Sequence, residues 1–349
     1  MSQIITRSEQ FSTLFPSAPA FRLKQIEKAL FEPNANGWEN ISTLPKEMRD
    51  TLIKDVPWIS STLFHMFKNQ RGDTYKAVLK TPDGKFFETV LMANKREQWT
   101  ICVSSQIGCA MKCTFCATGT MGLTRSLTSD EIVDQYRFWK NFLKENPDLA
   151  QRISNVVFMG MGEPLANYDN VKSAVTTWLE QTDLGPTRIT VSSVGILPLL
   201  EKILTDPTWP HVRIAISLHS ANLERRKEIV PTTAPDFLNK LADWSNLYAK
   251  TLGNRRHYIT YEYTLLNEVN DTEEHAEELA DYILTTGSSK INVIPYNPVA
   301  GKSFQRSQDD RIKKFKSILR ERGINVTQRR TMGDDIAAAC GQLVAQQNM

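Results

Sequence analysis

From Thr100 onward, short apolar runs alternate along the chain with segments whose apolar residues recur at helical spacing. Most of the runs are nearly continuous in apolar residues, which is typical of strands buried on both faces. They read TICVSS, ISNVVFM, RITVSS, VRIAISL, YITYEYTLL and KINVIPY, and INVTQ adds a weaker one. Strands that alternate with helices predict a parallel sheet covered by helices.

The first of the intervening helices has the clearest pattern. Thr128 and Glu131 have the spacing of a capping box, in which side chains and backbone N–H groups pair at the start of a helix. The apolar residues that follow predict its buried stripe: Ile132, Tyr136, Trp139 and Leu143.

The number of strand and helix units limits the architecture. About six units are fewer than the eight of a closed TIM barrel. No G-x-G-x-x-G or Walker sequence indicates a doubly wound nucleotide fold. We therefore predict an α/β protein whose residues 99–349 form a partial (β/α)6 TIM-like barrel, with a site at the carboxyl ends of the strands.

The first hundred residues follow a different pattern. Helical spacing in 20–31 and 44–56, where Pro45 suits a first helical turn, predicts two or three short amphipathic helices. We assign residues 1–72 to a small helical domain. The runs TYKAVLK and KFFETVLM flank the turn TPDG and predict a β-hairpin. We expect this hairpin, within 73–98, to connect the two domains.

Composition excludes several classes of protein. The 349 residues, 41% of them hydrophobic, can bury a sizeable core. No apolar run reaches the roughly 20 residues of a membrane span, and the start of the chain lacks the features of a secretory signal. We expect a cytoplasmic protein with no membrane association. The odd number of cysteines, three of them crowded together, favours metal or catalytic thiols over a disulfide framework.

The charge is nearly balanced. The net charge is +3, and the first hundred residues hold 14 Lys and Arg against 11 Asp and Glu. This excess is compatible with a nucleic-acid surface, but a pI of 8.5 is below the strongly basic range that would indicate one.

Cys109, Cys113 and Cys116 form a C-x3-C-x2-C pattern after the first predicted barrel strand. A structural zinc site and a fully ligated Fe–S cube each need four protein ligands, and no obvious fourth ligand is near. Three thiolates on a 4Fe–4S cube leave one iron open, and S-adenosylmethionine can chelate that iron. The pattern is typical of the radical S-adenosylmethionine (radical SAM) superfamily, with a zinc site and a distant fourth ligand as the alternative.

The turn GMGEP follows the next strand. Its glycines, Gly160 and Gly162, would allow a ligand to approach the backbone closely, and Glu163 could pair with the ammonium group of the cofactor. An ordinary glycine turn is the alternative.

Several segments, in order, resemble the RlmN/Cfr family of radical SAM RNA methyltransferases, over a range from about Phe21 to Leu343. They are CVSSQIGCAMKCTFCATG, GMGEPLAN, ISLHS, KINVIPYNP and GDDIAAACGQL. The resemblance implies methylation of an adenine carbon in 23S rRNA and, for RlmN members, of the adenosine 3′ to the tRNA anticodon. Pro164 favours carbon 2, as in RlmN, over the carbon 8 of Cfr-like enzymes.

The resemblance also implies residue roles. Its cofactors are a 4Fe–4S cluster on the three cysteines and S-adenosylmethionine. Cys340 would carry the methyl group, and Cys102 would release the product through a transient disulfide. Without the resemblance, Cys102 would be interpreted as a buried core cysteine. Glu88 would be the base for the adenine proton, with a pKa raised by its apolar neighbours; an exposed edge-strand carboxylate is the alternative.

The residues that the resemblance assigns to S-adenosylmethionine follow, or lie near the ends of, predicted strands. They are Gly162, Glu163, Ser192, Ser217, Leu218, His219 and Asn297. The implied partners are 23S rRNA, tRNA and a reductant such as flavodoxin or ferredoxin, and we expect a monomer. The chain ends six residues after GQL, so we expect RNA contacts at Arg22, Lys24 and the helical domain, or at Arg329 and Arg330.

Two other classes of protein remain open. Another radical SAM enzyme, such as a glycyl-radical activase, would use the same cysteine loop but would need neither Cys340 nor Cys102. A zinc-stabilised RNA-binding protein would use the thiols without catalysis.

Overall fold

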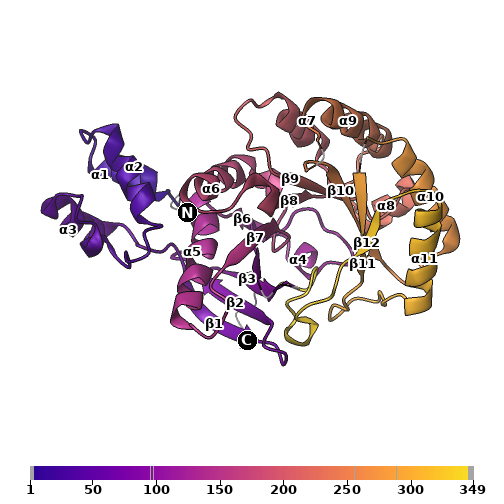
Figure 1. Ribbon diagram of the computed structural model, residues 1–349, viewed down its shortest axis with the longest axis horizontal. Helices are drawn as coiled ribbons and strands as arrows, with labels where there is room; N and C mark the ends of the chain where they lie inside the picture. Colours follow the sequence, from indigo (N-terminus) through magenta and orange to yellow (C-terminus); the bar gives the residue numbers. More distant parts are fainter. Residues whose placement is uncertain (1–3, 95, 97, 255, 288, 345–349) are drawn as a thin grey trace.

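The computed structural model describes residues 4–94, 96, 98–254, 256–287 and 289–344. Over these ranges the chain forms a ten-stranded sheet, a separate two-stranded sheet and a helical domain on one side (Figure 1). No helix in this part of the chain is both long enough and apolar enough to cross a membrane.

The predicted partial barrel is confirmed. Each of its strands is parallel to its neighbours, in chain order. They are β4 (Trp99–Cys102), β7 (Ile153–Phe158), β8 (Ile189–Ser193), β9 (Arg213–Ser217), β10 (Ile259–Leu265), β11 (Ser289–Pro295) and β12 (Val326–Gln328).

Helices surround this sheet on the outside (Figure 1). They are α5 (Ser129–Glu145), α6 (Tyr168–Gln181), α7 (Leu197–Thr205), α8 (Leu223–Ile229), α9 (Phe237–Thr251), α10 (Glu273–Leu284) and α11 (Asp309–Glu321). In α5 the capping box of Thr128 and Glu131 is present, and the predicted apolar stripe is buried. The carboxyl ends of the strands therefore share one open side of the barrel, where their loops form the site.

The predicted hairpin consists of β2 (Thr74–Lys80) and β3 (Phe86–Ala93). It also belongs to the barrel sheet, because β3 pairs antiparallel with β4 and places Val90 opposite Cys102. An unpredicted strand, β1 (Thr62–Lys68), pairs on its other side. The predicted hairpin is therefore an extension of the barrel sheet, and β3 is an interior strand.

The cysteine loop is framed by short elements that the sequence did not indicate. They are β5 (Gln106–Gly108), α4 (Ala117–Thr120) and β6 (Leu123–Ser126), with β5 and β6 paired antiparallel. Gly108 has a φ of +78°, and a Cβ at this position would overlap the carbonyl oxygen of Gly122. Glycine is therefore required where the chain enters the loop.

The helical domain has its own core. It contains α1 (Arg7–Leu14), α2 (Ala20–Ala29) and α3 (Lys46–Asp55), with a 3-10 turn at Trp38–Asn40. Pro45 lies just before α3 rather than within its first turn. The buried residues of this core are Phe11, Ile26, Ala29, Trp38, Ile41, Leu44, Leu52 and Val56.

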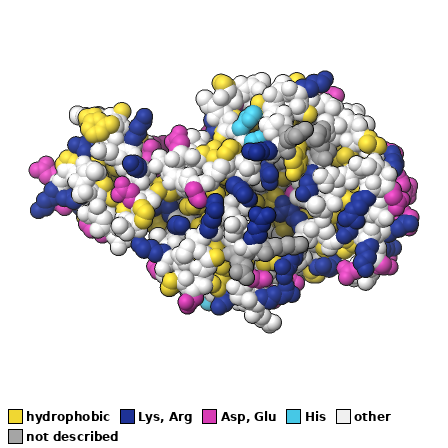
Figure 2. All heavy atoms as spheres, in the orientation of Figure 1, with side chains coloured by type: hydrophobic (Ala, Val, Ile, Leu, Met, Phe, Trp, Pro, Cys, Tyr) yellow, Lys and Arg dark blue, Asp and Glu magenta, His cyan; other side chains and the backbone are white. Residues whose placement is uncertain are grey.

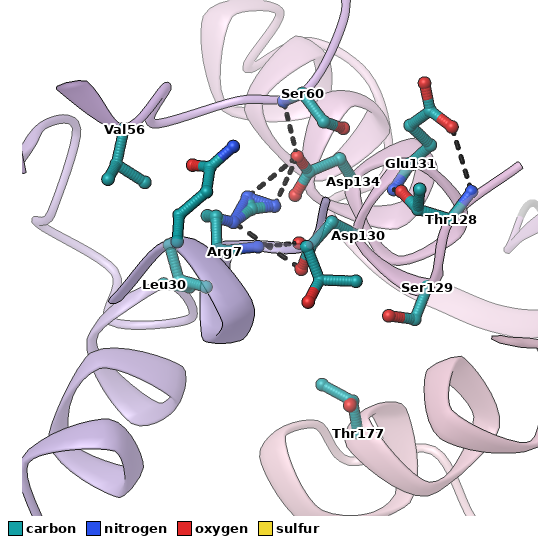
Figure 3. A network of polar contacts seen from close by, with 12 residues as sticks. Arg7, Leu30, Val56, Ser60, Thr128, Ser129, Asp130, Glu131, Asp134 and Thr177 are labelled. Carbon is teal, nitrogen blue, oxygen red and sulfur yellow. Dashed lines mark hydrogen bonds and ion pairs between the residues drawn. The ribbon is translucent and has the colours of Figure 1, made fainter. Parts of the chain in front are cut away.

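A buried polar network joins this domain to the barrel helix α5 (Figure 3). The Nη2 of Arg7 lies 2.6 Å from Asp134 Oδ2, which also accepts the backbone N–H of Ser60 at 2.7 Å. Arg137 donates to the other oxygen of Asp134 at 2.6 Å. Burial alone would raise the pKa of Asp134, but the two guanidinium groups hold it below its usual range. The carboxylate is therefore ionised and fixes the helical domain against α5.

Candidate functional site

One cavity lies at the carboxyl ends of the parallel strands and brings together most of the predicted site. The predicted residues that line it are Cys109, Cys113, Cys116, Gly162, Glu163, Ser192, Ser217, His219, Asn297 and Cys340. Leu218 is not among its lining residues, because its fully buried side chain packs in the core.

The three loop cysteines are close enough to interact electrostatically. Burial raises the pKa of Cys109 to about 12 and raises that of Cys113 as well, and neighbouring thiols add to both shifts. Yet no three His, Cys, Asp or Glu side chains in the described part of the chain form a group that could hold one metal ion. Three cysteines that line one cavity provide the donor set of a 4Fe–4S cube with one open iron, whereas a structural zinc ion needs a fourth protein ligand.

Glu163 is a buried carboxylate with no ion pair to any described Lys or Arg residue. It accepts the backbone N–H groups of Leu165 at 3.0 Å and Val194 at 2.9 Å, and burial raises its pKa. A buried carboxylate that lines a cavity and lacks a cationic partner can bind a ligand ammonium group. Its position therefore fits the amino group of S-adenosylmethionine.

The protein's own backbone requires both glycines of GMGEP. A Cβ at Gly160 would lie 2.7 Å from the carbonyl oxygen of Val103, and one at Gly162 would lie 2.7 Å from the backbone nitrogen of Gln106. Gly162 also has a φ of +97°. The close approach that requires glycine is therefore made by the protein's own chain, although Gly162 also lines the cavity.

His219 has a backbone φ of 57°, a region that costs energy for residues other than glycine. Its Nδ1 accepts the backbone N–H of Thr264 at 3.1 Å, and its ring contacts that of Phe115. Burial, helped by the charge of Arg226, lowers the pKa of His219 to about 3. The ring is therefore neutral, with its remaining proton on Nε2 as a donor.

Cys340 lines the first cavity and also a second one, which Cys102 lines as well. Both thiols are free; Cys340 is exposed and Cys102 is buried. Burial raises the pKa of Cys102 to about 12. The Cys340 thiol is desolvated by the atoms around it although the residue as a whole is exposed, and its pKa is raised to about 11; the charge of Arg329 opposes both shifts. The two cysteines thus face one space, as the pairing implied by the resemblance requires.

Arg329, one of the expected RNA contacts, is partly exposed and also pairs within the protein. Its guanidinium donates to both carboxylate oxygens of Glu262 at 2.9 Å and lines the second cavity. Glu262 itself lines the first cavity and was missed in the sequence. A carboxylate in the middle of the apolar run YITYEYTLL was the signal that could have identified it.

Glu88 is fully buried, so the alternative of an exposed edge carboxylate is wrong. Its Oε1 lies 3.1 Å from Nζ of the buried Lys76, and its Oε2 accepts the backbone N–H of Val344 at 2.9 Å. Burial raises the pKa of Glu88, and Lys76 opposes that shift. Glu88 lines neither cavity, and the residue that contacts its Oε2, Val344, belongs to the C-terminal segment, residues 330–344.

The C-terminal segment that carries Cys340 is held from several sides. Asn297 donates to the carbonyl oxygen of Cys340 at 3.3 Å, and the backbone N–H of Ala117 donates to that of Gly341 at 2.8 Å. Lys76 donates to the carbonyl oxygen of Ala337 at 3.2 Å. The segment therefore bridges β11, the cysteine loop and the hairpin.

Comparisons with known proteins agree with this geometry. The radical SAM superfamily model matches residues 103–283. The ribosomal RNA large subunit methyltransferase N of Nitrosopumilus maritimus is 39% identical and covers 93% of this chain and 92% of its own length. A probable dual-specificity RNA methyltransferase RlmN of Rhodopirellula baltica is also 39% identical, over 93% of this chain and 84% of its own.

A solved structure extends the match to the whole fold. The radical SAM methyltransferase of Sphaerobacter thermophilus is 36% identical and superposes with a TM-score of 0.88 over 98% of each chain. These relatives imply a 4Fe–4S cluster and S-adenosylmethionine as the cofactors, in agreement with the donor groups of the first cavity. The chain therefore belongs to the radical SAM superfamily and, within it, to the RlmN family of RNA methyltransferases.

Proposed function

We propose that this enzyme methylates carbon 2 of an adenine in 23S rRNA and of the adenosine 3′ to the tRNA anticodon, with Cys340 as the methyl carrier. The double target is supported by the dual specificity that names several relatives. Lys and Arg side chains gather across the middle of the face drawn in Figure 2, where Figure 1 places the barrel strands. Such a surface suits the phosphates of RNA.

The position of Cys340 carries the proposal. An adenine carbon is too electron-poor to attack a methyl sulfonium directly, so a carrier is needed. Cys340 lines both the cavity of the cysteine loop and the cavity that contains Cys102. A carrier must meet the cofactor in one place and the resolving thiol in another, and this position meets both conditions.

The cofactors, when bound, supply an organic radical that can take a hydrogen atom from a methylthio group. The cluster would be held by Cys109, Cys113 and Cys116, and Glu163 would bind the ammonium group of S-adenosylmethionine. Ser192, Ser217 and Asn297 line the same cavity and would complete the binding site.

Release of the product requires the thiolate of Cys102. It attacks the sulfur of Cys340, so that an S–S bond forms, the bond between that sulfur and the methyl carbon breaks, and its electron pair passes to the product. The buried thiol of Cys102 ionises with difficulty. In the second cavity, the backbone of Met159 and the positive charge of Arg329 both favour its thiolate.

Glu88 would remove the proton from the adenine carbon. Burial raises its pKa, which suits a general base. In this structure the backbone N–H of Val344 and Lys76 occupy its two oxygens. The C-terminal segment must therefore move from Glu88 when the adenine enters.

The test combines a digest with two cysteine variants. Anaerobically loaded enzyme is incubated with an rRNA fragment or with tRNA, and nucleosides are identified by mass spectrometry. We expect 2-methyladenosine from the wild type, no methylated adenosine with Cys340→Ala or Cys340→Ser, and a covalent RNA–protein adduct with Cys102→Ala. Finding 8-methyladenosine would assign Cfr-like chemistry, and methylation by Cys340→Ala would refute the carrier role.

A further inference from the structure

Arg226, in α8, is a fully buried arginine whose hydrogen-bond acceptors are all neutral. It donates to the backbone carbonyl oxygens of Leu218 at 3.0 Å, Val194 at 2.6 Å and Ser217 at 3.1 Å, and to the hydroxyl of Thr233 at 2.5 Å. Its guanidinium also lies 3.6 Å from the ring centroid of Phe237. None of the ion pairs among the described residues includes it.

This lack of a counter-ion sets Arg226 apart from the other buried arginines. Arg7 and Arg137 share the carboxylate of Asp134. A buried charge without an opposite charge is costly, even when its hydrogen bonds are satisfied. Burial lowers the pKa of Arg226 to about 9, so it still carries its charge at neutral pH. Some other group must offset this cost.

The surroundings of Arg226 place it directly behind the cysteine loop. The end of α8 is bound to that loop, since the backbone N–H of Thr114 donates to the carbonyl oxygen of Ile229 at 2.9 Å. Cys113 packs against Ile229 in one apolar cluster. The negative charge of a Cys113 thiolate raises the pKa of Arg226. The loop that would receive the cluster therefore lies against the helix that carries Arg226.

We propose that the 4Fe–4S cluster with its three cysteine thiolates is the counter-ion of Arg226, and that Arg226 stabilises the reduced cluster. Three thiolates carry more negative charge than the oxidised iron–sulfur core carries positive charge, so the centre is an anion. Reduction adds one further negative charge at the same place. A fixed positive charge in a medium of low dielectric constant favours the reduced state more than the oxidised state. Arg226 thus acts on the cluster from behind the cysteine loop that would hold it and contacts no substrate.

The first test measures the reduction potential of the cluster. Arg226→Met, Arg226→Gln and Arg226→Lys are loaded anaerobically, checked for iron content, and titrated with spectroscopic detection of the reduced cluster. We expect a more negative potential in the Met and Gln variants and a potential near that of the wild type in the Lys variant. The control is Arg225→Met on the same helix, where the lost cation is partly exposed and pairs with Glu278. An unchanged potential in fully loaded Arg226→Gln would overturn the proposal.

The second test separates this role from simple support of the loops. Unfolding temperatures are measured for each variant with and without the cluster. If the cluster is the counter-ion, the gain in stability on loading is smaller in Arg226→Gln than in the wild type. An arginine that only ties loops together would lower both temperatures equally, and that result would also overturn the proposal. Neither test depends on which adenine carbon is methylated, so failure here and failure of the proposed function are distinguishable.

Discussion

The attachment of the helical domain to the barrel depends on one buried carboxylate, and Asp134→Asn should weaken it. The substitution keeps the size of the side chain but removes the charge that Arg7 and Arg137 share. Asparagine can still accept the backbone N–H of Ser60 through its oxygen. Two guanidinium groups would then remain in a buried site without their common counter-ion.

The structure limits the size of the effect. Breaking a buried ion pair by removing one partner costs about 3–5 kcal/mol. Arg137 retains the carbonyl oxygens of Leu30 at 2.9 Å and Trp58 at 2.8 Å, and Arg7 retains Asp130 at 3.6 Å. We therefore expect the free energy of unfolding to fall by about 3 kcal/mol, at the lower end of that range.

Urea unfolding followed by tryptophan fluorescence measures this loss. Trp38 and Trp58 stack edge to face in the helical domain, with ring centroids 4.9 Å apart, so their emission reports on that domain. The control is Asp130→Asn, because the partly exposed pair of Asp130 with Arg7 should contribute less than about 1 kcal/mol. The variant Asp134→Asn should lose stability first in the helical domain.

Acid should reproduce the effect in the wild type. Since the pKa of Asp134 is lowered in the folded state, its contribution is present above the unfolded pKa of about 3.9 and is lost as the pH falls through the folded value. The reasoning is refuted if Asp134→Asn unfolds at the same urea concentration as Asp130→Asn.

Three further predictions concern the site. Lys76→Met removes the charge that opposes the raised pKa of Glu88, so the rising limb of the pH–rate profile should move to higher pH. Lys76→Arg keeps the charge and should leave the limb near its wild-type position. An unmoved limb in Lys76→Met would contradict a base role for Glu88. In the enzyme without cofactors, iodoacetamide should alkylate Cys340 well before Cys102, because Cys340 is exposed and has the lower pKa; peptide mass spectrometry checks this, and equal rates would argue against it. Gly162→Ala should lower the free energy of unfolding by about 1–3 kcal/mol and weaken S-adenosylmethionine binding, as measured by denaturation and calorimetry, and wild-type values would show that the turn can adapt.

The barrel could be predicted because its strands are buried on both faces and so appear as apolar runs. The start of α5 could be predicted because its capping box lies within four consecutive residues. In contrast, β1 has mostly exposed side chains, and β5 is only three residues long, so neither has a pattern long enough to detect. Their pairing is set by distant parts of the chain.

Site residues could be predicted where they stand close together in a short sequence motif. They could not be predicted where their role depends on contacts between residues far apart in the sequence. The three loop cysteines and Glu163 stand in short motifs. The ion pair of Lys76 with Glu88 and that of Arg329 with Glu262 join residues on different strands or loops. The sequence could not indicate that Arg226 lacks a counter-ion. Only the fold shows that no described carboxylate pairs with it.

The ends of the ten-stranded sheet, β1 and β12, do not pair with each other in the described chain. The space between them is spanned by the C-terminal segment, which makes scattered hydrogen bonds instead of a strand ladder. Each hydrogen bond contributes about 1 kcal/mol, so displacing the C-terminal segment costs a few kcal/mol. Contacts between the protein and an incoming nucleotide can offset this cost. A barrel closed by continuous strand pairing would resist the entry of RNA. A gap covered only by a loop segment can open to admit one base and then close again.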